Sequence, residues 1–229
     1  MTDSRPVPVP SAVRALATRL GVPACPKATR ASLTQHGSLR EAPSDRWRRF
    51  SAHQHIRLRE TAFEWRASMR PFGAISVVDA LTDGVPNLEV RLFRCIRLAR
   101  VSGSDAASRG ELIRYLAELP WAPDAMLANR GLAWTVVDDR TIRVGASLGT
   151  VHAEVEFVLD SAGRVQTASA HGRPRREGDQ FVERPWQGRF SGYRQHQGRV
   201  LPFRGEVGWV LDGQAFTAWK GRIDSWTLS

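Results

Sequence analysis

The sequence has little cysteine and little lysine. Cysteine occurs twice in 229 residues, as Cys25 and Cys95, and neither lies in a Cys-x-x-Cys motif. A disulfide framework or a zinc site would need more of them, so reduced structural cysteines are expected. Only Lys27 and Lys220 accompany the arginines among the 33 basic residues. Such an excess of arginine over lysine can reflect a bias towards arginine codons as much as a functional requirement for arginine.

Long apolar runs and known catalytic motifs are also missing. No stretch of about 18 apolar residues is present, so no transmembrane helix is expected. The start, MTDSRPVPVPSAVRALATRL, lacks the apolar core of a secretory signal, which favours a cytoplasmic protein. The sequence has no Gly-x-Ser-x-Gly, phosphate-binding loop, dinucleotide fingerprint or His-Glu-x-x-His. No cofactor is therefore expected.

The net charge of +10 is compatible with an acidic partner such as nucleic acid. The arginines are spread along the chain, however, and the two densest clusters, RWRR (46–49) and RPRR (173–176), are short. A solvated basic surface is favoured over nucleic-acid binding.

Apolar and polar residues alternate along most of the chain, which is the period of a strand with one buried face. In FEWRASMR (63–70), for example, Phe63 and Trp65 share the apolar side. The dipeptides Asp83-Gly84 and Asp212-Gly213 are typical of hairpin turns, because both residue types accept positive φ. About ten strands joined by short turns predict a mainly β protein with an antiparallel meander.

Two segments depart from this alternation. Residues 1–27 read as a Pro-rich lead-in followed by a short helix in SAVRALATRLG, where Ser11 can form the N-cap and Gly21 ends the helix. Residues 28–229 are expected to form a single domain. Within it, residues 108–127 form a central helical insert.

The central insert, SRGELIRYLAELPWAPDAML, begins with a predicted capping box of Ser108 and Glu111 and is broken at Pro120. Its apolar stripe must be buried on the apolar face of the sheet. A sheet of about ten twisted strands tends to curl. Together these features predict a strongly curved sheet, or half-barrel, with a helix packed on its concave side.

Several segments resemble an uncharacterised bacterial family, a domain of unknown function. They are GELIRYLAELPWAPDAML, RPWQGRFSGYRQHQGRVLP, GEVGWVL and FEWRASM…VVDALTDG. More distantly, FEWRAS followed by DALTDG, and the YR…GRVLP hairpin, resemble the lipoprotein-carrier superfamily. That resemblance implies a curved sheet around a helix, with acyl chains held in the concavity. Those carriers work outside the inner membrane, whereas this chain lacks a signal-type start. The resemblance supplies no catalytic residues.

The candidate ligand site lies between the expected helix and the concave face. Eight tryptophans could either line a cavity or fill a plain aromatic core. Arginine suits an acidic head group such as a carboxylate. The residues assigned to the apolar part are Trp65, Leu116, Leu119, Trp121, Trp134 and Trp209, and those assigned to the polar end are Asp79, Arg114 and Tyr115.

The charged candidates each have a plainer interpretation. Glu111, Arg114 and Glu118 share a helix stripe that could face a ligand, but an exposed face with an i, i+4 ion pair is favoured. Asp79 lies in an apolar strand, where it could serve as an acid or base or simply bond turn amides.

Metal binding is also weighed and disfavoured. His53 and His55 lie on one face of a strand, a spacing that can serve a metal. A third ligand is not evident, and Arg49 and Arg57 would repel a cation. No metal site is therefore predicted.

The favoured function is that of a non-enzymatic binding protein for a hydrophobic or lipid-like small molecule. A cavity enzyme, a hydrolase or isomerase using Asp79 or Glu118 as acid or base, is the first alternative. The second is a basic adaptor for nucleic acid or a membrane surface, which would depend on Arg46, Arg48, Arg175 and Arg176. The ligand and the oligomeric state stay open.

Overall fold

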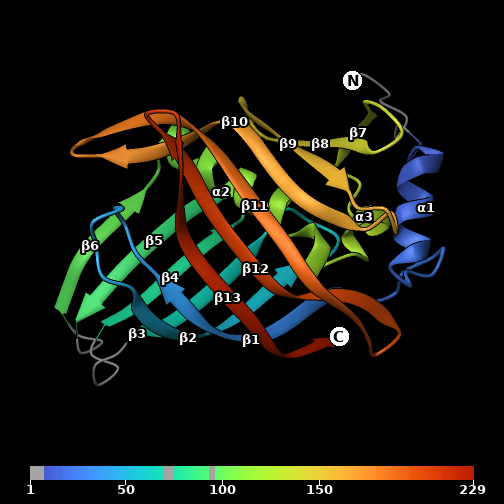
Figure 1. Cartoon of the computed structure of the whole chain (residues 1–229), viewed down its shortest axis with the longest axis horizontal. Coiled ribbons are helices and arrows are strands. Elements are labelled where there is room, and N and C mark those ends of the chain that lie inside the picture. The colour runs from blue at the N-terminus through green and yellow to red at the C-terminus, as the bar shows by residue number, and fades with distance from the viewer. Residues whose placement is uncertain (1–7, 70–74, 93–95) are drawn as a thin grey trace.

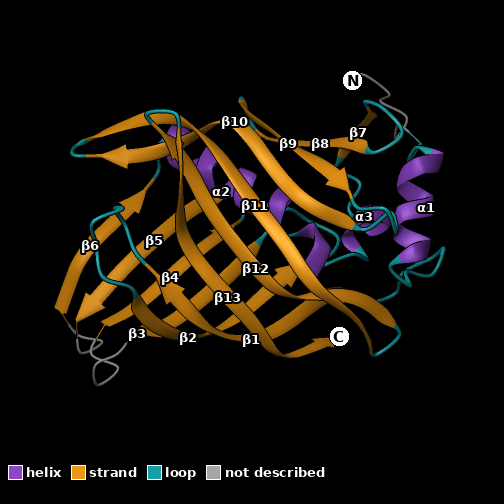
Figure 2. Ribbon diagram, in the orientation of Figure 1, coloured by secondary structure: helices purple, strands orange, loops and turns teal. Residues whose placement is uncertain are grey.

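One antiparallel sheet forms the body of the protein (Figures 1 and 2). The structure is a computed structural model that describes residues 8–69, 75–92 and 96–229. Cys95 and the first seven residues of the lead-in lie outside this range. The thirteen strands are β1 Arg30–Leu39, β2 Arg48–Arg57, β3 Phe63–Met69, β4 Ile75–Thr82, β5 Val85–Leu92, β6 Ile96–Ser102, β7 Ala133–Val136, β8 Thr141–Leu148, β9 Val151–Leu159, β10 Val165–Glu177, β11 Gln180–His196, β12 Arg199–Leu211 and β13 Gln214–Leu228.

The strand order shows two meanders joined at one seam. It runs β6-β5-β4-β3-β2-β1-β13-β12-β11-β10-β9-β8-β7, so β1 pairs with β13 and every other pair is sequential. The chain reaches one edge at β6 and begins again at the opposite edge with β7. The helical insert is therefore the crossover between the two edges of an open sheet.

The prediction of a curved antiparallel sheet is confirmed, but the count of about ten strands is too low. Strand β7 has four mostly exposed residues, so it shows no apolar alternation. Strand β1 carries Gln35 and Gly37 on the face that turns inward. Strands of this kind give little signal in the sequence.

Alternation and turn chemistry account for the rest of the sheet. Phe63 and Trp65 are buried on β3, as the pattern predicts. At the β4–β5 turn Asp83 and Gly84 have φ of 51° and 75°, and at the β12–β13 turn Asp212 and Gly213 have 50° and 77°. Positive φ at both central residues matches the right-handed twist of the flanking strands. Both hairpin predictions are confirmed.

Helix α1 (Ser11–Arg19) packs on the main core through Val13, Leu16 and Ala17. Pro10 is its N-cap residue and no side chain caps it, so the predicted Ser11 cap is wrong. Gly21 has φ of 80°, which ends the helix as expected.

The central insert consists of three short helical segments, and the break predicted at Pro120 is confirmed. They are α2 (Asp105–Ala117), the 3₁₀ turn η1 (Leu119–Trp121) and α3 (Ala125–Ala128). Pro120 lies within the first turn of η1 and Pro123 precedes α3, so each proline stands near the start of a segment, where its missing N–H is tolerated.

The predicted capping box is also wrong. Ser104 is the N-cap residue, and its Oγ accepts a hydrogen bond from the Ala107 amide at 3.1 Å. The Ser108 amide already bonds the Ser104 carbonyl at 2.9 Å, within the first turn. Ser108 therefore lies inside the helix.

Helix α2 lies inside the curl of the sheet. In Figure 1 strands β10–β13 cross in front of β1–β5, and α2 is seen between them. It contacts β8, β9 and β10 from one meander and β4 and β5 from the other. Both halves of the sheet thus pack on one helix, whose Leu112, Ile113 and Leu116 are fully buried.

Candidate functional site

A pocket of about 250 Å³ lies between the concave face of the sheet and the end of helix α2. Strands of both meanders contribute to it, together with α2 and η1. Its aromatic lining consists of Trp65, Trp121, Trp186, Phe190 and Trp219. Its polar lining includes Gln35, Asp79, Arg114, Glu118 and Arg173.

Three glycines form a row across the sheet beneath the aromatic rings. Gly37 pairs with Gly221, and Gly221 pairs with Gly205, on β1, β13 and β12. A Cβ at Gly205 would lie 2.8 Å from the Trp121 ring, and one at Gly221 would overlap the ring of Trp219. Because these positions lack side chains, the indoles lie close against the backbone and the space above them stays open.

Trp121 is fixed at both its ring and its backbone. Its Nε1 donates to the Pro202 carbonyl at 2.9 Å, and its own carbonyl accepts from Trp226 Nε1 at 2.8 Å. Its ring meets Phe190 edge-on, with 5.3 Å between centroids, and lies 6.1 Å from Trp219. The aromatic wall is therefore preformed.

Opposite the aromatic wall, Arg114 joins two carboxylates. Its Nε donates to Glu118 Oε1 at 3.0 Å, and its Nη1 donates to Asp79 Oδ2 on β4. The side chains of Arg114 and Asp79 are each 15% exposed and that of Glu118 is 13% exposed. Burial alone would lower the pKa of Arg114, but the neighbouring carboxylates outweigh it and raise the pKa.

Amide side chains extend this polar network. Gln54 Nε2 donates to Glu118 Oε2, and Gln54 Oε1 accepts from Gln35 Nε2 at 2.5 Å. Trp65 Nε1 in turn lies 3.4 Å from Gln35 Oε1. The carboxylate of Glu118 is thus held by two partners, and the network reaches the aromatic wall at Trp65.

Glu111 adds a third carboxyl group from helix α2. Burial, and then the charge of Asp79, raise its pKa from 4.5 to about 8. Among the described residues no donor reaches Glu111 Oε2 or Asp79 Oδ1. A proton on Glu111 satisfies both groups, because a carboxylic acid donates to a neighbouring carboxylate.

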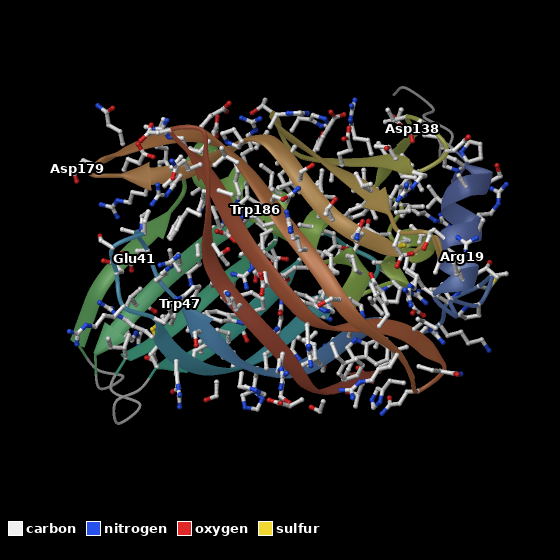
Figure 3. All side chains as sticks on the ribbon, in the orientation of Figure 1. Arg19, Glu41, Trp47, Asp138, Asp179 and Trp186 are labelled. Atoms are coloured by element: carbon white, nitrogen blue, oxygen red, sulfur yellow. The ribbon has the colours of Figure 1, made fainter. Side chains whose placement is uncertain are left out.

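Arg173 of β10 also belongs to the polar lining, and no pattern in the sequence indicated it. Its guanidinium carbon lies 5.0 Å from the Trp186 ring centroid and 5.6 Å from that of Trp209. Figure 3 labels Trp186 near the centre of the molecule. The pairing of β10 with β11 shifts between Ala170 and Arg173, and this irregularity turns Arg173 inward. The sequence pattern suggested only a basic surface cluster.

The structure brings together five of the predicted site residues, namely Trp65, Asp79, Arg114, Glu118 and Trp121, around this pocket. The favoured reading of the Glu111, Arg114 and Glu118 stripe as an exposed face is wrong, because α2 lies under both halves of the sheet.

The other predicted residues lie outside the pocket. Leu116 and Leu119 are fully buried in the core. Tyr115 is buried too, and its hydroxyl accepts from Asn129 Nδ2 at 2.9 Å and donates to the Arg57 carbonyl at 3.2 Å. Trp209 lies behind Arg173, whereas Trp134 is half-buried on the edge strand β7.

The remaining candidates show no clustering. His53 and His55 are exposed on β2, and the described residues contain no group of three or more side chains arranged to hold a metal ion. Arg175 bonds the Glu41 carbonyl at 2.8 Å, and Arg176 lies 3.7 Å from Asp179 at the tip of the β10–β11 hairpin (Figure 3). Cys25 is an exposed free thiol.

Solved structures share this fold at very low sequence identity. A LolA superfamily protein from Nitrosomonas europaea aligns with a TM-score of 0.50 at 8% identity, over 95% of this chain and 93% of the other. A DUF1329 family protein from Desulfovibrio piger gives a TM-score of 0.52 at 12% identity, over 96% and 93%. No curated protein matches the sequence.

The cytoplasmic location predicted from the missing signal-type start is contradicted by the likeness in fold to a LolA superfamily protein. Within the described ranges, no helix is both long and apolar enough to cross a membrane.

The sequence profile of one family matches residues 7–227, almost the whole chain. The expected relationship to a domain of unknown function is confirmed, and the expected likeness to the lipoprotein carriers is found in the fold, which a LolA superfamily protein shares. The chain belongs to the Family of unknown function DUF6920.

Proposed function

We propose that this protein binds one small hydrophobic or lipid-like molecule, without catalysis, in the pocket between the concave sheet and the end of helix α2. The observation that carries the proposal is the preformed aromatic wall over the glycine row, which leaves about 250 Å³ open. A fold shared with a LolA superfamily protein supports a carrier role outside the cytoplasm.

The volume limits the size of the ligand. An apolar cavity of about 150 Å³ holds one benzene molecule, so a pocket of about 250 Å³ takes about ten non-hydrogen atoms. One short acyl chain or a small ring system fits this limit. A larger lipid would have to leave most of its body outside the pocket.

Native mass spectrometry of the purified protein, followed by solvent extraction, tests the proposal. We expect a stoichiometric apolar molecule in the wild type. Val207→Trp should abolish its retention by filling the pocket, because Val207 is part of the lining. Val210→Trp is the matched control, since Val210 is on the same strand but outside this pocket. Equal retention by both variants would contradict the proposed site.

Acid–base catalysis by Glu111 of helix α2 is a second candidate. Burial and the charge of Asp79 raise the pKa of Glu111 to about 8, which suits a general acid near neutral pH. Asp79 and Glu118, the bases proposed from the sequence, are both engaged by Arg114. An extracted molecule that the wild type converts over hours and Glu111→Gln leaves unchanged would favour the enzyme.

A further inference from the structure

Arg173 is a partly buried arginine that has no ion-pair partner among the described residues. Its buried Nε likewise has no acceptor in the described part of the chain. Burial lowers the pKa of its guanidinium, although Glu111 and other carboxylates oppose this. A cation held in this way is costly for the folded protein unless an anion compensates it.

The neighbouring carboxylates are already committed elsewhere. Asp79 and Glu118 bind Arg114. Glu111 attracts Arg173, but burial and the charge of Asp79 raise the pKa of Glu111 to about 8, which favours its neutral form. At the edge of the lining, Glu206 lies 3.9 Å from Lys220. Of the three carboxylates in the pocket lining, two pair with Arg114 and the third, Glu206, pairs with Lys220, so none pairs with Arg173.

The tryptophans fix the guanidinium while leaving its donors free. The Arg173 guanidinium lies over two indole rings, that of Trp186, which lines the pocket, and that of Trp209, which does not. These two ring contacts hold the planar group in place. Stacking on an aromatic face uses the π surface of arginine and leaves its in-plane N–H groups available. Those N–H groups match the two oxygens of a carboxylate or another oxyanion.

We infer that the ligand is an anionic amphiphile, with one oxyanion head group bound by Arg173 and one short apolar body lying against Trp121 and Trp219. This rests on the proposed binding function and specifies the ligand class. The assignment moves the head-group contact from Arg114, which the sequence suggested, to Arg173. Arg114 instead positions the wall by tying β4 to helix α2.

Isothermal titration calorimetry at pH 7 with octanoate and with 1-octanol tests the inference, because the two probes share a chain and differ in the charged head. Octanoate has ten non-hydrogen atoms, which suits the volume. We expect the wild type to prefer octanoate by roughly 10- to 100-fold, the range of one charged hydrogen-bonded contact. Arg173→Gln should lose this preference while still binding 1-octanol.

Arg175→Gln is the matched control. Arg175 also lies over the Trp209 ring, at 5.7 Å, but it is partnered by Glu177 and the Glu41 carbonyl and does not line the pocket. It should keep the preference for octanoate. Arg173→Met provides a second neutral variant. The preference is the ratio of the affinities for octanoate and 1-octanol within one protein, so a partly unfolded sample does not change this ratio.

The outcomes separate the two proposals. If neither probe binds the wild type, the pocket is not a ligand site and both proposals fail. If the wild type binds both probes equally, or if both neutral variants keep the full preference for octanoate, the anionic head group is excluded while the binding function stands. Loss of the preference in Arg175→Gln would likewise overturn the assignment to Arg173.

Discussion

Arg114 of helix α2 donates to Asp79 of β4, and this contact ties the central helix to the N-terminal meander. The same guanidinium holds Glu118 at the end of the helix and lies 4.8 Å over the Phe63 ring. The helix is therefore joined to this half of the sheet by a charged contact as well as by apolar packing.

Removing Arg114 should be strongly destabilising. Arg114→Met leaves Asp79 and Glu118 as largely buried carboxylates with no cation, and we expect the free energy of unfolding to fall by about 3 kcal/mol. Urea denaturation measures this. Arg109→Met on the same helix is the control, because its pair with Glu183 is more exposed and should be worth less than about 1 kcal/mol. Equal losses in the two variants would contradict a buried network.

The pH dependence of stability should report on Glu111. Its pKa is raised in the folded state, from 4.5 to about 8, so the folded protein binds more protons than the unfolded chain between these values. The contribution of Glu111 to the free energy of unfolding is therefore greatest below pH 4.5. This contribution falls by up to about 1.4 kcal/mol per pH unit as the pH rises to 8.

Glu111→Gln should remove that slope and stabilise the protein at pH 8 to 9 by roughly a few kcal/mol. The charged groups that face Glu111 are Asp79 on β4, Arg114 on α2 and Arg173 on β10. Thermal unfolding from pH 5 to 9 compares the variant with the wild type. Parallel curves for the two proteins would show that Glu111 does not titrate in this window.

The glycine row should tolerate no side chain. In Gly221→Ala the new methyl group overlaps the Trp219 ring, so we expect a loss of about 1–3 kcal/mol and a changed near-ultraviolet circular dichroism spectrum.

Gly110→Ala is a control for this substitution with the opposite sign. Gly110 lies inside helix α2, and its nearest neighbour to a Cβ is the Pro174 carbonyl at 3.9 Å. Removing a helical glycine there should stabilise the protein by about 0.5–1 kcal/mol. A stabilised Gly221→Ala protein would rule out a close approach of Trp219.

The N-cap of α2 gives a paired test of where the helix begins. Ser104→Ala removes the hydroxyl that accepts from the Ala107 amide and should cost about 1 kcal/mol. Ser108→Ala should be close to neutral, because Ser108 lies beyond the cap. Urea denaturation of both variants decides between the two start sites, and the reverse order would restore the capping box predicted from the sequence.

The sequence predicted much of the sheet because period-two alternation and Asp-Gly turns are local properties. Phe63 and Trp65 point inward because side chains alternate between the two faces of a strand, and this alternation is visible in the sequence. The site was harder to predict. The charge of Glu111 and Arg114 suggested an exposed helix face, and only the crossover between the sheet edges buries them.

Arg173 and the glycine row could not have been predicted from local patterns. The shift in pairing before Arg173 reverses the face that simple alternation assigns to it. Gly37, Gly205 and Gly221 lie far apart in the chain, and they become neighbours only through the β1–β13 and β12–β13 pairings.

The seam between β1 and β13 also has a kinetic consequence. Residues 31–39 pair with residues 219–228, so the centre of the sheet closes over almost the full length of the chain. Such non-local pairing carries a large loop-closure entropy and slows folding. During synthesis the first meander must wait for the last strand to emerge. The pocket between the sheet and helix α2, which draws on both meanders, therefore forms only at the end of folding, and the ligand proposed above could enter only after synthesis is complete.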